Sequence, residues 1–98
     1  MATITCSRTT GTKTLSGTTI DTITINSGPF DVCNWTGATD LTVTWEAGTA
    51  VDPVAGAAET FRVPAGTARR IDPSWVGPNP IQVKVLGNGN TYSVDRAG

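Results

Sequence analysis

Five stretches of this chain alternate apolar and polar residues with a period of two. Successive side chains of a β-strand point to opposite faces, so this alternation predicts strands with one buried and one solvated face. Such strands are typical of antiparallel sheets. No segment shows the period of an amphipathic helix. The alternating stretches are 22–25, 40–46, 60–63, 81–85 and 91–95.

Turn-forming residues separate the alternating stretches. The run Gly87-Asn88-Gly89-Asn90 supplies the positive φ angles of a tight turn, so 81–86 and 91–95 are predicted to form a C-terminal hairpin. Pro64-Ala65-Gly66 predicts a second reversal. Together these signals divide the chain into about eight strands: 2–8, 20–26, 30–35, 41–46, 59–63, 67–71, 81–86 and 91–95.

Length and composition suit a small β-sandwich. The 98 residues are enough for one domain, which we expect to span 1–98. Charged residues make up only 15% of the chain, whereas threonine occurs 18 times. Threonine is β-branched and suits a half-exposed strand surface. We therefore predict an all-β fold, a small antiparallel β-sandwich with either an immunoglobulin-like or a jelly-roll path.

The residue types of common catalytic sites are largely missing. Without histidine the chain cannot build a Ser-His-Asp or Cys-His arrangement. The net charge of −1 argues against a nucleic-acid partner, and no apolar run is long enough for a membrane span. We therefore expect no enzyme activity, no cofactor and no metal. Five aspartates are predicted to cap turns or strand ends: Asp21, Asp31, Asp40, Asp52 and Asp72.

Two cysteines, Cys6 and Cys33, leave two alternatives open. They can form a disulfide between strands, or they can be separate buried thiols. The N-terminus lacks the basic start and apolar run of a secretory signal, so synthesis in the cytoplasm is expected. A reducing compartment favours the thiols.

Two tryptophans are candidate contact residues. Trp75 lies in a proline-rich loop with Val76 and Pro78, and a stiff loop loses less entropy on binding. Trp35 alternates away from the apolar residues of its strand, which predicts an exposed ring. Trp75 can instead fold back over one end of the sandwich. As an exposed ring it can anchor a protein contact or stack on a sugar.

Residues 41–94 resemble small β-rich virion proteins of tailed phages, especially those of actinobacteria. The resemblance covers a little over half of the chain and depends on the order of several short motifs. They are Leu41-Thr42-Val43-Thr44-Trp45, Val51-Asp52-Pro53-Val54-Ala55-Gly56, Val63-Pro64-Ala65-Gly66, Ile81-Gln82-Val83-Lys84-Val85 and Thr91-Tyr92-Ser93-Val94. Proteins of this kind include capsid decoration proteins, and the resemblance implies no catalytic residues.

The resemblance and the missing chemistry lead to one expected function. It is that of a phage virion structural protein, a capsid decoration protein that stabilises the particle through protein–protein contacts. Its partners would be other virion proteins, either the major capsid protein or further copies of itself. We expect an oligomer or a lattice-associated protein, such as a trimer, located in the virion. The alternative is a carbohydrate-binding or host-attachment module of a tail or surface protein.

Overall fold

The structure, a computed structural model, describes residues 2–26, 29–36, 39–54, 60–72 and 80–96. These residues form nine strands and no helix. Within them, no helix has the length and apolar character needed to cross a membrane. The strands are β1 (Thr3–Cys6), β2 (Lys13–Thr14), β3 (Ile20–Ile25), β4 (Phe30–Thr36), β5 (Leu41–Ala47), β6 (Phe61–Val63), β7 (Ala68–Ile71), β8 (Ile81–Leu86) and β9 (Thr91–Arg96).

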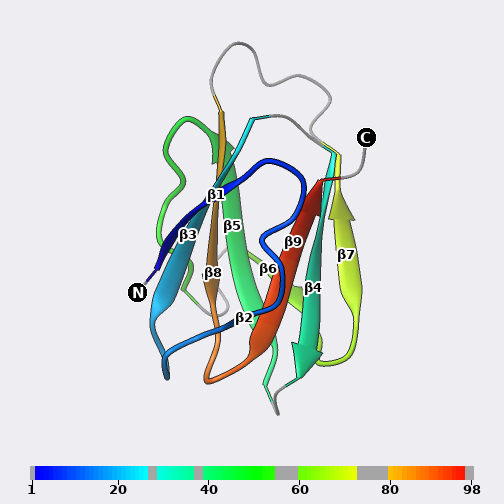
Figure 1. The fold of residues 1–98 in the computed structure, drawn as a ribbon. Helices are drawn as coiled ribbons and strands as arrows, with labels where there is room; N and C mark the ends of the chain where they lie inside the picture. The colour runs from blue at the N-terminus through cyan, green and yellow to red at the C-terminus, as the bar shows by residue number, and fades with distance from the viewer. Residues whose placement is uncertain (1, 27–28, 37–38, 55–59, 73–79, 97–98) are drawn as a thin grey trace.

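The strands form two sheets that pack face to face (Figure 1). One sheet has five strands in the order β1-β3-β8-β5-β6, and the other has four in the order β2-β9-β4-β7. Every neighbouring pair is antiparallel except β1 and β3, which run parallel. The antiparallel β-sandwich predicted from the alternation is therefore confirmed.

The pairing of the strands is nested along the chain. β5 pairs with β6, β4 with β7, β3 with β8, and β2 with β9. The chain from β2 to β9 is thus one long antiparallel ribbon, and the pairs β4–β9 and β5–β8 roll this ribbon into two sheets. This is the path of a jelly roll. It decides between the two paths that the sequence left open.

The predicted C-terminal hairpin is wrong. β8 pairs with β3 and β5 in the five-stranded sheet, whereas β9 pairs with β4 and β2 in the other sheet. The turn between them does have a positive φ, at Gly89, but it carries the chain across the core. Both strands bury their apolar residues, and facing sheets bury them more fully than one sheet would. The Pro64 reversal likewise joins β6 and β7 in different sheets.

The core lies between the inward faces of the two sheets. Burying a large apolar side chain contributes roughly 1.5–3 kcal/mol before entropy is counted. Trp45 and Phe61, which share the face of the buried residues in their strands, are only partly buried at its margin, where the Trp45 ring meets Phe30 edge-on with ring centroids 6.4 Å apart. The largest fully buried side chains are Tyr92, Phe30, Leu15, Ile23, Ile25, Leu41, Ile81, Val32, Val43, Val63, Val83 and Val85.

The aspartates do not all behave as predicted. Asp21 is 3% exposed and points into the core, where its carboxylate accepts hydrogen bonds from the Tyr92 hydroxyl (2.7 Å) and the backbone N–H of Ala2 (2.9 Å). The prediction of a turn cap is wrong for Asp21, because it lies on the buried side of β3, alternating with the half-buried Thr22 and Thr24. Three others form ion pairs with cations of other segments: Asp31 with Arg70, Asp40 with Arg62 and Asp52 with Lys84.

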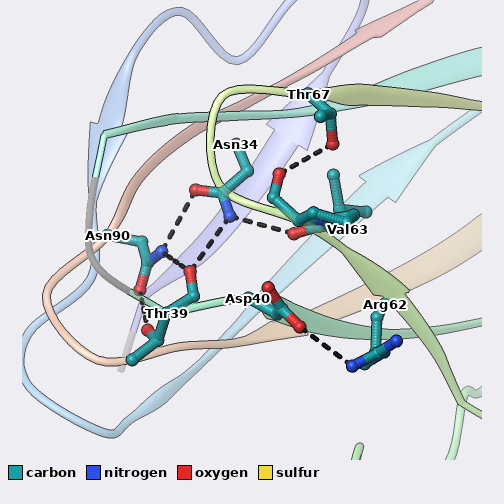
Figure 2. Close-up of polar contacts among 8 residues, drawn as sticks. Asn34, Thr39, Asp40, Arg62, Val63, Thr67 and Asn90 are labelled. Atoms are coloured by element: carbon teal, nitrogen blue, oxygen red, sulfur yellow. Dashed lines mark hydrogen bonds and ion pairs between the residues drawn. The ribbon is translucent and has the colours of Figure 1, made fainter.

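Two buried asparagines fix one end of the sandwich (Figure 2). The Asn90 amide donates to the Thr39 carbonyl (2.7 Å) and to Asn34 Oδ1 (3.1 Å). The Asn34 amide donates to the carbonyls of Val63 (2.9 Å) and Thr39 (3.2 Å). Asn90 Oδ1 accepts from the Thr39 hydroxyl and from the Asn88 backbone N–H. The β8–β9 turn is thereby tied to β4, to residue 39 and to the end of β6.

Candidate functional site

The candidate contact residues fall into two groups. Trp75, Val76 and Pro78 lie outside the described residues, so their roles stay predictions. Trp35 lies near the end of β4, on the solvent-facing side of the four-stranded sheet, and its side chain is 55% exposed. The predicted exposure of Trp35 is confirmed, and Trp35 is the residue around which we describe a site.

A β-bulge places the Trp35 ring. Asn34 pairs with Tyr92 and Thr36 pairs with Thr91, so Trp35 is an extra residue in β4 without a partner in β9. Asn34 points inward and is 1% exposed, whereas Trp35 and Thr36 are exposed in succession. A bulge breaks strict alternation and re-aims the side chains that follow it. The irregularity therefore presents two neighbouring side chains to solvent at one point of the sheet.

The Trp35 ring is held by a chain of hydrogen bonds. Its indole N–H donates to Ser93 Oγ at 2.8 Å, and the Ser93 hydroxyl donates to Asp95 Oδ2 at 3.3 Å. The other oxygen of Asp95 accepts from the Thr9 hydroxyl at 2.5 Å. Ser93 is only 4% exposed, so the indole is anchored to a buried group. The ring is thus oriented before any ligand arrives, which lowers the entropy lost on binding.

On one side of Trp35 the neighbouring side chains are polar and carry no charge. The hydroxyls of Thr36 and Thr91 hydrogen-bond to each other. We call the group formed by Trp35, Thr36, Thr91, Ser93 and Asp95 the Trp35 surface. It lies on the outer side of strands β4 and β9, next to each other in Figure 1.

An ion pair lies near the start of β4, at Asp31. The Arg70 guanidinium donates to both carboxylate oxygens of Asp31, at 2.8 and 3.2 Å. This hydrogen bond lowers the pKa of Asp31, against a smaller opposing effect of burial, and it raises the pKa of Arg70. Both groups stay charged at neutral pH and satisfy each other. A protein that binds over this part of the sheet therefore covers an ion pair and not a single unpaired charge.

Neither cysteine has the character of a nucleophile. Both are free, which agrees with the thiol alternative. The Cys6 thiol lies in the core and donates to the Val94 carbonyl at 3.6 Å, and the Cys33 thiol donates to Asp95 Oδ2 at 3.7 Å. Burial is the largest cause that raises the pKa of each thiol, and the Asp95 charge raises both further. The thiols therefore stay protonated at neutral pH.

We expect both thiols to resist alkylation in the folded chain. At neutral pH, iodoacetamide should modify Cys6 and Cys33 slowly in buffer and fully in denaturant, because unfolding removes the burial that raises the pKa of each thiol. Intact-mass spectrometry counts the added groups. Rapid modification of Cys33 in native protein, with Cys6 unmodified, would show instead that the outer face leaves its thiol reactive.

A hollow lies beside the β8–β9 turn. Its volume is about 220 Å³, and its lining residues are Thr18, Thr39, Asp40, Thr42, Leu86, Gly87 and Asn88. The one carboxylate in this lining, that of Asp40, is paired with Arg62 at 3.3 Å. Among the described residues, no three His, Cys, Asp or Glu side chains are grouped so that they could hold a metal ion.

Sequence reasoning singled out only Trp35 of the Trp35 surface and missed Thr36, Thr91, Ser93 and Asp95. Ser93 and Asp95 alternate with Tyr92 and Val94, so the pattern indicated that they face away from the core. Nothing in the pattern showed that β9 pairs with β4, and only this pairing brings Ser93 to the indole of Trp35.

Comparison of the chain with protein-family models, with curated proteins and with solved structures finds no match in any of the three. The fold and the surface therefore define the protein by themselves. It is a small jelly-roll sandwich with an exposed, oriented tryptophan on the outer side of its four-stranded sheet. Jelly rolls host unrelated functions, so the surface and not the fold indicates what the protein does.

Proposed function

We propose that this chain is a non-enzymatic phage virion structural protein, a capsid decoration protein that stabilises the particle by binding another virion protein through the Trp35 surface. The observation that carries the proposal is the exposed indole of Trp35, fixed by its hydrogen bond to buried Ser93. Tryptophan is enriched among the few residues that supply most of the binding energy at protein interfaces.

The charges near the Trp35 surface support a packing role. The side chain of Asp95 accepts hydrogen bonds from Thr9 and Ser93, and Asp31 is paired with Arg70. Charges that already have partners cost less to remove from water than isolated charges. The surface can therefore be covered by another protein while the carboxylates of Asp31 and Asp95 keep their hydrogen-bond partners. Jelly rolls also occur as capsid domains, which is an argument by analogy.

A second candidate function is carbohydrate binding for host attachment. The observation that favours it is the pair of hydroxyls on the outer side of the sheet next to Trp35, from Thr36 and Thr91. An aromatic ring flanked by hydroxyls can contact the apolar face of a sugar and hydrogen-bond its edge. The two candidates share Trp35 but differ in ligand, so binding assays separate them.

Trp35→Ala is expected to weaken binding to capsid shells at least about tenfold, the loss typical of a central interface residue. The unsubstituted chain, added to shells that lack it, should bind and raise their melting temperature. Val51→Ala is the matched control, because Val51 is 59% exposed and lies outside the Trp35 surface. Trp35→Phe keeps an aromatic ring but loses the hydrogen bond to Ser93. Its affinity for shells should therefore lie between the affinities of Trp35→Ala and the unsubstituted chain.

Three results would contradict the proposal or select its alternative. If shells bind Trp35→Ala as tightly as the unsubstituted chain, the Trp35 surface is not the binding surface. Absence of the chain from purified virions, measured by mass spectrometry, would remove the virion assignment. A positive glycan array whose signal is lost in Trp35→Ala would select the carbohydrate-binding function.

A further inference from the structure

Among the described residues, the β1 edge, formed by Thr3–Cys6, is the least protected edge of the two sheets. In the described part of the chain, β1 pairs with β3 alone. Proteins usually blunt open edges with charged side chains. The other three edge strands carry them, with Lys13 in β2, Arg62 in β6, and Arg69 and Arg70 in β7. The β1 edge contains only Thr, Ile and Cys, so nothing in its sequence opposes the addition of another strand.

The backbone of β1 presents a regular set of hydrogen-bonding groups to this edge. The Thr22 N–H donates to the Ala2 carbonyl at 2.8 Å, so the backbone of Ala2 faces β3. Residues along a strand direct their backbone groups alternately to one side and the other. Ile4 therefore faces β3 as well, while Thr3 and Thr5 face outward. The edge thus offers the N–H and the C=O of Thr3 and of Thr5.

The sequence of β1 is self-complementary. Thr3-Ile4-Thr5 reads the same in both directions. In an antiparallel pair centred on Ile4, Thr3 of one copy lies opposite Thr5 of the other. Each such pair exchanges two hydrogen bonds, so the outward N–H and C=O groups of both copies are all satisfied. The two Ile4 side chains, each half-buried against the core, meet in the closely spaced pair between them.

We propose that the β1 edge is a dimerisation site, at which a second copy of this chain adds its own β1 in antiparallel orientation. The two copies are related by a twofold axis at Ile4, so each contributes the same strand, β1, to the interface. A second copy fits this edge because the palindrome pairs Thr with Thr and Ile with Ile, and because neither side carries a charge. The dimer joins the two five-stranded sheets into one continuous sheet. The Trp35 surface lies on the other sheet and stays free (Figure 1).

Two charged variants of β1, one with lysines and one with glutamates, test this pairing. In the proposed register, Thr3→Lys with Thr5→Lys sets lysine against lysine, and Thr3→Glu with Thr5→Glu sets acid against acid. Each double variant should dimerise at least about tenfold more weakly than the unsubstituted chain, because juxtaposed like charges oppose association. A mixture of the two should form a heterodimer. Sedimentation over a concentration series up to millimolar measures the dissociation constants. Thr24→Lys on β3, which lies opposite the uncharged Gln82, is the control for an added charge.

Amide hydrogen exchange on the unsubstituted chain gives a test that needs no variant. The N–H groups of Thr3 and Thr5 should become protected as the concentration rises, whereas that of Ile4 is protected throughout by β3. The proposal is overturned if the unsubstituted chain stays monomeric over the whole series with rapidly exchanging Thr3 and Thr5. It is equally overturned if both double variants remain folded and dimerise like the unsubstituted chain.

Discussion

Asn90→Ala is expected to lower the free energy of unfolding by about 3 kcal/mol, the upper part of the usual range for orphaned buried polar groups. The Asn90 side chain is fully buried and takes part in four hydrogen bonds. Alanine leaves Asn34 Oδ1 and the Asn88 N–H without these partners, and removes one of two donors to the Thr39 carbonyl. The end of the sandwich in Figure 2 loses the side chain that holds the β8–β9 turn.

Chemical denaturation measures this loss, and the same turn supplies the control. Asn88 is exposed and contributes its backbone N–H to the network, so Asn88→Ala should change the free energy of unfolding by less than about 0.5 kcal/mol. Asn90→Asp keeps the acceptor but replaces the donor with an oxygen that faces two other oxygens. It should destabilise the fold at least as much as alanine. Equal stabilities of Asn88→Ala and Asn90→Ala would show that the network contributes nothing.

The alternation of the sequence predicted the strands well because it reports directly on burial. Ile81, Val83 and Val85 are fully buried in β8, and Tyr92 and Val94 are fully buried in β9, as the period of two requires. The alternation does not report which strand lies beside which. A turn such as Gly87-Asn88-Gly89-Asn90 suits a hairpin, and it also suits a crossing between sheets. The pairing is decided by packing across the whole core.

Asp21 and Trp35 show two further limits of the pattern. Asp21 stands at an inward position beside Ile23, but its charge favoured a surface turn. A buried carboxylate needs a hydrogen-bond partner, and here the partner is 71 residues away in the sequence. Trp35 was predicted to be exposed from alternation, and this is confirmed. The bulge that sets its position is absent from the pattern because it arises from pairing with β9.

Tyr92→Phe is expected to lower the free energy of unfolding by about 2–3 kcal/mol, since it removes a donor from a buried charged acceptor. The phenylalanine ring fills the same space, so the effect comes from the hydroxyl that bonds Asp21 Oδ2 at 2.7 Å. Adding Asp21→Val should recover part of the loss, because the two neutral side chains leave no carboxylate in need of a partner. Denaturant unfolding of Tyr92→Phe, Asp21→Val and the double variant completes a double-mutant cycle, which measures the coupling energy between the two side chains. Strictly additive losses would argue against the coupling.

The same hydroxyl makes stability depend on alkaline pH. Burial raises the pKa of Tyr92 well above the ordinary tyrosine value of about 10, and the hydrogen bond to Asp21 and the Asp21 charge raise it further. A group whose pKa is raised by folding contributes its full stability below its unfolded pKa and loses it above. Stability should therefore fall as the pH rises past about 10, where the unfolded tyrosine ionises and the folded one does not.

Tyr92 is the only tyrosine of the chain, so tyrosinate absorbance reports on this residue alone. In an alkaline titration the absorbance should rise only together with the loss of the circular dichroism of the fold, because the folded state excludes the ionised ring. Tyr92→Phe should unfold with a weaker dependence on pH above about 10, since the remaining dependence comes from the other groups that titrate there. A tyrosinate signal near pH 10 from a chain that is still folded would mean that the ring reaches solvent. The link between Tyr92 and Asp21 would then not hold the two sheets together.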